Sequence, residues 1–202
     1  MLKTLILISA LTFGSFAAAR ADGITGNFTL SGTDAYTTTT LNFGSAVIGA
    51  AGSGPVTGTF ATYLTNGTTV DFYPGTLFYA NGSNVVSPAF QLFTVTENGE
   101  TFTFDLSDYT AVYTSGTNLF GTFTNLTIEG GGDFTGSGSV AYTDSPGSIN
   151  FSSQTEGGQT TTTFSASAEA AGASPVPEPA SLALFGTGLL GVVGIARRKL
   201  KV

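Results

Sequence analysis

The chain has 202 residues, a formal net charge of −7, and neither cysteine nor histidine. All Lys and Arg residues lie close to the N-terminus or the C-terminus, and none occurs from Ala21 to Ala196. The stretch from Ala21 to Ala196 cannot neutralise phosphates, so nucleic acid and anionic lipid headgroups are excluded as its partners. Disulfide bonds are excluded as well.

The first 21 residues have the pattern of a signal peptide. Lys3 supplies the positive charge, and a short apolar run from Leu5 to Phe13 follows it. Ala19 and Ala21 each end a small-x-small triplet, which is the usual cleavage pattern. The sequence therefore predicts export, with a signal peptide at 1–21 and a mature chain that begins near residue 20 or 22.

Short runs of alternating residues follow the signal peptide. Ile24, Phe28 and Leu30 alternate with Thr25 and Thr29, so one face of this run is apolar and the other polar. Such a period of two predicts strands that are buried on one side. Similar runs occur at Phe102–Leu106, Phe120–Ile128, Val140–Tyr142, Ile149–Phe151 and Thr160–Ala166.

Turn signals separate these runs. Asn66-Gly67, Asn81-Gly82 and Asn98-Gly99 are dipeptides typical of tight hairpins. Pro146-Gly147 and Gly130-Gly131-Gly132 indicate two more turns. The spacing predicts an all-β domain, as a sandwich or a barrel. The preferred prediction is an antiparallel β-sandwich of jelly-roll type over 22–167, followed by a linker at 168–176.

Catalysis is restricted by the missing residue types. Without His and Cys, and without Lys between the ends, Ser-His-Asp, thiol, Schiff-base and imidazole-zinc chemistry are all excluded. Two facing carboxylates could still hydrolyse a glycoside, but no pair stands out in the sequence. We therefore expect a protein that is not an enzyme, with no catalytic residue.

One turn carries a candidate metal site. Glu97 and Glu100 flank Asn98-Gly99, so a tight hairpin would oppose two negative charges, which destabilises a strand pair. A Ca²⁺ ion would relieve that repulsion, with Asp105 and Asp108 as further ligands. The alternative, favoured because no EF-hand spacing is present, is a solvated turn. No other cofactor is predicted.

The C-terminal 26 residues differ from the rest of the chain. Pro177-Glu178-Pro179 precedes an apolar stretch at 180–196, which as a helix would be about 25 Å long. This length is at the short end of what spans a bilayer core of ~30 Å. The basic cluster Arg197-Arg198-Lys199 then marks the cytoplasmic side and stops transfer.

The proline motif, the Gly-rich apolar stretch and the basic cluster, in this order and spacing, closely resemble the PEP-CTERM sorting signal. The resemblance covers only 177–202. It implies a Gram-negative bacterium that makes exopolysaccharide, and an exosortase as the processing partner. The inner membrane would hold the chain transiently before it reaches the cell surface or extracellular matrix. Such a signal gives a destination and no activity.

The expected function is a non-catalytic structural or adhesive role at the surface, associated with exopolysaccharide. The alternative is a carbohydrate-binding module, with or without assistance from calcium. A carboxylate-based glycoside hydrolase and an ice-binding protein rank lower. The threonine runs at 37–40 and 160–163 would suit ice binding, but no fixed period relates them.

Overall fold

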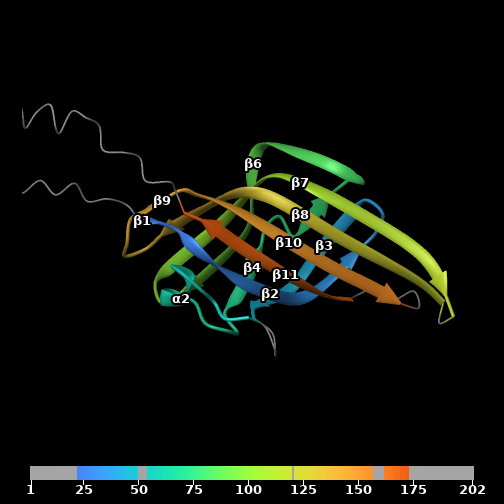
Figure 1. Ribbon diagram of the computed structural model, residues 1–202, viewed down its shortest axis with the longest axis horizontal. Helices are drawn as coiled ribbons and strands as arrows, with labels where there is room; N and C mark the ends of the chain where they lie inside the picture. Colours follow the sequence, from blue (N-terminus) through green and yellow to red (C-terminus); the bar gives the residue numbers. More distant parts are fainter. Residues whose placement is uncertain (1–21, 50–53, 120, 157–161, 173–202) are drawn as a thin grey trace, which may run out of the picture.

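The computed structural model describes residues 22–49, 54–119, 121–156 and 162–172 (Figure 1). The predicted signal peptide at 1–21 and the predicted membrane helix at 180–196 lie outside these residues. Within them, no helix is long and apolar enough to cross a membrane.

The described residues are mostly strand, which confirms the all-β prediction. One short helix, α2, covers Phe60–Tyr63. The strands are β1 (Asp22–Gly23), β2 (Thr25–Tyr36), β3 (Thr40–Ile48), β4 (Thr69–Phe72), β5 (Thr76–Phe78), β6 (Gly82–Glu97), β7 (Glu100–Asn118), β8 (Gly121–Ser137), β9 (Tyr142–Thr143), β10 (Ser145–Glu156) and β11 (Thr162–Ala171).

The long strands form one sheet that closes on itself. Its order is β2-β11-β10-β8-β7-β6-β4-β3-β5, and β2 also pairs with β3. Apart from the pairing that closes the ring, each long strand pairs with its neighbours in the chain order, all antiparallel. β2 and β11 complete the ring from Thr25 to Asp34. The predicted jelly-roll order is therefore wrong, because jelly rolls need long crossovers and this chain forms a meander.

Aromatic side chains fill the inside of the closed sheet. Phe28 on β2 meets Phe93 on β6 with ring centroids 6.2 Å apart, although these strands are not neighbours. Phe43 on β3 meets Phe151 on β10 at 5.8 Å. These edge-on contacts bury large apolar areas and stabilise opposite sides of the sheet against each other. The interior is thus a packed core in which side chains replace solvent.

Two of the predicted turns lie inside strands. Gly130 to Gly132 belong to β8, and Pro146-Gly147 belongs to β10, where Gly147 pairs with Gly132. A Cβ at Gly132 would lie 2.0 Å from the carbonyl oxygen of Asp105 on β7. Gly132 is therefore present because neighbouring backbone comes too close for a side chain, and not because the chain reverses.

The predicted hairpin at Asn98-Gly99 is confirmed. Asn98 has φ 52° and Gly99 has φ 81°, the left-handed values that a two-residue turn of this kind requires. Asn66-Gly67 instead joins α2 to β4, and Asn81-Gly82 leads into β6.

The domain boundary predicted at residue 167 is too early, because β11 continues to Ala171. The alternation does not stop there. Ala168 and Ala170 are buried, whereas Ser167 and Glu169 face outward. The small alanines that favour a linker in the sequence fill the inward positions of a strand.

Candidate functional site

A groove lies beside the first half of β6, where β4 no longer pairs with it. β4 pairs with β6 from Val70 to Phe72, and the N–H of Tyr73 donates to the carbonyl of Leu92 at 2.9 Å. Beyond that point β5 pairs only with β3, and the first part of β6, Gly82–Val85, pairs only with β7. The two strands therefore diverge and leave an opening between their edges.

The groove has a volume of about 530 Å³ and no charged residue in its lining. Phe78 from β5 is 73% exposed, and Val85 from β6 is 84% exposed. Both are large apolar side chains that face solvent. The lining consists of Pro74, Thr76, Leu77, Phe78, Asn84, Val85, Val86, Ser87, Phe90 and Tyr109.

Contacts with neighbouring segments fix both walls of the groove in place. On β5, Leu77 is buried and pairs with Leu41, and the hydroxyl of Tyr109 donates to the carbonyl of Phe78. Near the start of β6, the side-chain carbonyl of Asn84 accepts from the N–H of Ala80 at 3.0 Å. The groove is therefore preformed, as binding sites for small ligands usually are.

The two glutamates of the predicted metal site are cross-strand partners, but their carboxylates have different protein donors. Glu97 accepts hydrogen bonds from the N–H of Thr65 at 2.7 Å and from the hydroxyls of Thr65 and Thr68. These hydroxyls hold the pKa of Glu97 below its usual value.

Glu100 is buried, with none of its surface exposed to solvent. One carboxylate oxygen accepts from the N–H of Ser139 at 2.6 Å and from the hydroxyl of the same residue. These bonds lower the pKa of Glu100 although burial opposes the shift. The other oxygen, Oε2, and the hydroxyl of Tyr142 are buried and have no hydrogen-bond partner.

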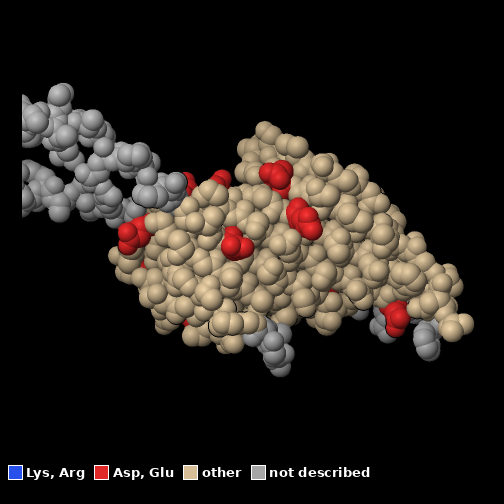
Figure 2. Space-filling model, viewed as in Figure 1, with Lys and Arg blue, Asp and Glu red and all other residues tan. Residues whose placement is uncertain are grey.

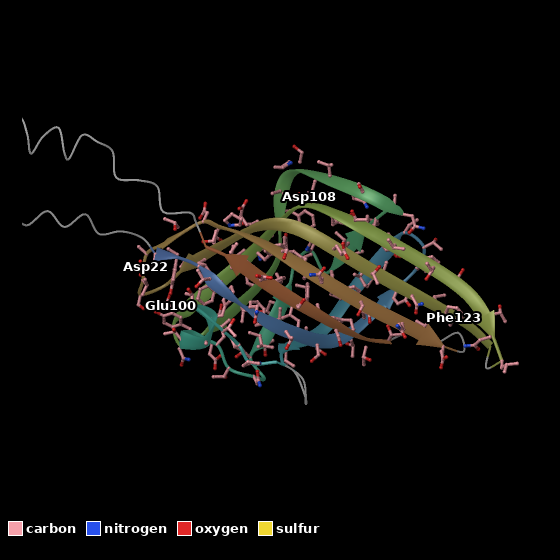
Figure 3. All side chains as sticks on the ribbon, in the orientation of Figure 1. Asp22, Glu100, Asp108 and Phe123 are labelled. Atoms are coloured by element: carbon pink, nitrogen blue, oxygen red, sulfur yellow. The ribbon has the colours of Figure 1, made fainter. Side chains whose placement is uncertain are left out.

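The two aspartates of the predicted metal site lie elsewhere on β7. Figure 3 shows Glu100 near one end of the domain and Asp108 closer to its middle. Asp105 pairs with Asp133 on β8, and burial, Asp133 and Asp144 together raise the pKa of Asp105. No group of three or more acidic side chains among the described residues could hold a metal ion. The calcium site stays a prediction.

The acidic side chains are also dispersed over the surface. Figure 2 shows them as separate red patches, with no blue residue on the described part of this face.

One further carboxylate is internal. Asp34 is 2% exposed and accepts from the hydroxyls of Ser153 at 3.0 Å and Thr162 at 2.7 Å. Burial raises its pKa, while these hydrogen bonds oppose the shift.

The sequence did not indicate the groove. Its walls come from strands that are adjacent in the chain but fail to pair, and no local pattern reports such a failure. The one usable signal is that Leu77 and Phe78 are consecutive apolar residues at a strand end, so one of them must face outward.

Comparison with known proteins assigns the C-terminal segment. Residues 175–199 match the family model of the PEP-CTERM protein-sorting motif, which confirms the resemblance. The motif implies an exported protein that an exosortase processes, with a surface or extracellular destination. Its residues, like Ala19 and Ala21, lie outside the described part of the structure. No curated protein and no solved structure matches the chain.

Proposed function

We propose that this chain is a non-catalytic, adhesive component of the cell surface or extracellular matrix, and that its groove binds uncharged stretches of exopolysaccharide. The observation that carries the proposal is the preformed groove with its exposed Phe78 and its uncharged lining. The C–H faces of neutral sugars pack on aromatic rings, while hydroxyls such as those of Thr76 and Ser87 supply polar contacts.

The charge of the domain supports a neutral ligand. All 13 acidic residues of the chain precede the membrane stretch, and no Lys or Arg accompanies them in the domain. An acidic polysaccharide would be repelled at low salt, whereas a neutral one is indifferent to this field.

A binding role is favoured over catalysis by the same lining. None of its residues is a carboxylate, and the one titratable group, Tyr109, donates its hydroxyl to Phe78. Hydrolysis of a glycoside would need two carboxylates beside the bound sugar. We also propose that binding needs no calcium, because Glu97 and Glu100 already accept hydrogen bonds from protein donors.

The delivery route completes the proposal. The signal peptide at 1–21 directs export in a Gram-negative bacterium, and the stretch at 180–196 holds the chain briefly in the inner membrane. Exosortase processing near Pro177-Glu178-Pro179 then delivers the domain to its site of action.

Affinity electrophoresis tests the binding step. Residues 22–172 contain every strand of the closed sheet, so they can be run as a domain through gels with neutral or acidic polysaccharide. We expect neutral glucans or galactans to retard it and alginate not to. Phe78→Ala should abolish the retardation, and a chelator should leave it unchanged.

A matched control comes from β7, outside the lining of the groove. Val112 is 47% exposed and does not line the groove, so Val112→Ala should migrate as the parent does in every gel. Retardation by none of the neutral polymers, or equal retardation of the Phe78→Ala domain, would refute the proposed function.

A further inference from the structure

The closed sheet extends into an arm at one end. The arm consists of β7 from Tyr113 to Asn118, β8 from Gly121 to Asn125, and β10 from Gln154 to Glu156, and it projects at the right of Figure 1. β8 is the middle strand of the arm. β6 pairs with β7 only as far as Ala111, so the β7 side of the arm is an edge among the described strands.

A side chain protects the first residue of this edge. The N–H of Tyr113 donates to the side-chain carbonyl of Asn81 at 2.7 Å, and the Asn81 amide donates to the carbonyl of Tyr113 at 3.3 Å. Asn81 therefore occupies the position of the next strand. Because outward groups alternate along an antiparallel strand, Ser115 and Thr117 also direct their backbone N–H and C=O away from β8.

The rest of the edge lacks the usual protection. Natural edge strands carry Lys, Pro or bulges that prevent pairing with another chain. The segment Thr114–Asn118 has no charged residue and no proline, and it pairs with β8 without a register shift. Ser115 and Thr117 are exposed.

Charge distinguishes the partner. The domain carries acidic side chains and neither Lys nor Arg, so its net negative charge repels a second copy. In the described arm the one carboxylate is Glu156 on β10, and β8 separates β10 from β7. The edge is thus an uncharged strip on which two copies of this chain can approach.

We propose that two copies pair through this edge, by antiparallel strand addition about a two-fold axis at Gly116. Ser115 of each copy then pairs with Thr117 of the other, which forms four backbone hydrogen bonds. This register uses both open residues and leaves the Asn81–Tyr113 contact intact. Gly116 has no side chain to obstruct the axis, and the ring of Phe123 lies against it from the same chain.

Disulfide trapping tests the register, because the chain has no cysteine of its own. Partners in such a pair have Cα atoms about 5.5 Å apart, within the range that a disulfide spans. Ser115→Cys and Thr117→Cys domains (residues 22–172) are mixed and oxidised mildly. We expect the mixed dimer to exceed the yield of random pairing, and each homodimer to fall below it.

A second measurement covers the strand itself. Thr117→Pro removes the outward N–H but suits an edge strand, so the domain should fold and self-associate less than the parent in sedimentation. Thr117→Ser keeps the N–H and should sediment as the parent does. Random disulfide yields, a dominant homodimer of either variant, or a Thr117→Pro domain that self-associates like the parent would overturn the proposal.

Discussion

Glu97 and Glu100 face each other across a two-residue turn, and each carboxylate is bound by hydroxyl and amide donors from a different segment. Opposed charges are thus tolerated because both have hydrogen-bond partners.

Replacement of the buried member should be the more harmful change. In Glu100→Gln the side chain loses its charge, and the Ser139 donors lose a charge-assisted acceptor in a site without solvent. We expect a lower melting temperature for Glu100→Gln than for Glu97→Gln. Glu97 is partly exposed, so water can accept the hydrogen bonds that its carboxylate gives up. Thermal unfolding of both domains at neutral pH measures the difference; equal melting temperatures would contradict it.

Calcium should act on this domain only as a salt. Since both glutamates have protein donors and no group of three acidic side chains among the described residues could hold a metal ion, Ca²⁺ should raise the melting temperature no more than NaCl of equal ionic strength. Calorimetric scans in the two salts compare them. An extra rise with Ca²⁺ that Glu100→Gln removes would restore the predicted metal site.

Asp34 should make the stability of the domain depend on pH, and Asp34→Asn should remove that contribution. Burial raises its pKa, so the folded state binds the proton more tightly than the unfolded state does. The parent should therefore gain stability relative to Asp34→Asn as the pH falls from 7 through the raised pKa, and the gain should level off below the unfolded value of about 3.9. Urea unfolding of both domains at several pH values gives the difference. A gap that widens against the parent on acidification would show the opposite sign.

A methyl group at Gly132 should be costly. The added Cβ would meet the backbone of Asp105 at 2.0 Å, and backbone cannot rotate away. We expect Gly132→Ala to destabilise the domain by about 1–3 kcal/mol, as overpacking does. Gly54 is the control, because its Cβ position is open, so Gly54→Ala should stay within about 0.5 kcal/mol of the parent. Chemical denaturation of the two variants measures the difference, and equal stabilities would contradict the expectation.

The sorting motif should be required for processing. Changing Glu178→Ala together with Pro179→Ala removes two of the three residues of the Pro177-Glu178-Pro179 motif, which lies in the matched segment. We expect unprocessed chain to accumulate in the inner membrane fraction. Immunoblots of cell fractions and the mass of the mature C-terminus provide the measurement, and normal surface delivery with an unchanged mass would contradict it.

The sequence predicted where strands form better than how they connect. Alternation placed Phe28, Leu30, Phe102 and Phe104 correctly as core residues, because a strand with one buried face leaves this record locally. The turn at Asn98-Gly99 was equally local. The order of strands around the sheet depends on pairings between distant residues, and a period of two is the same in a jelly roll and a meander.

Glycine was the main source of error. Gly130 to Gly132 and Gly147 resembled turn residues, yet they permit close contact between β7, β8 and β10. A glycine chosen for space and one chosen for conformation are identical in sequence, so only the neighbours across the sheet distinguish them. The donors of Glu97 and Glu100 were hidden for the same reason, since Thr65 and Ser139 lie far from them in the chain.

Closure of the sheet by β2 and β11 also determines where the two ends of the domain lie relative to the arm. Thr25 pairs with Ala171, so both ends of the domain leave from one pole, and Figure 3 shows Asp22 and Phe123 at opposite poles. A copy held through its C-terminal side therefore points its arm away from the surface that holds it. A two-fold axis at Gly116 reverses the second copy, so its tether lies on the opposite side. The proposed pairing would therefore join copies held on two facing surfaces and not neighbours held on one.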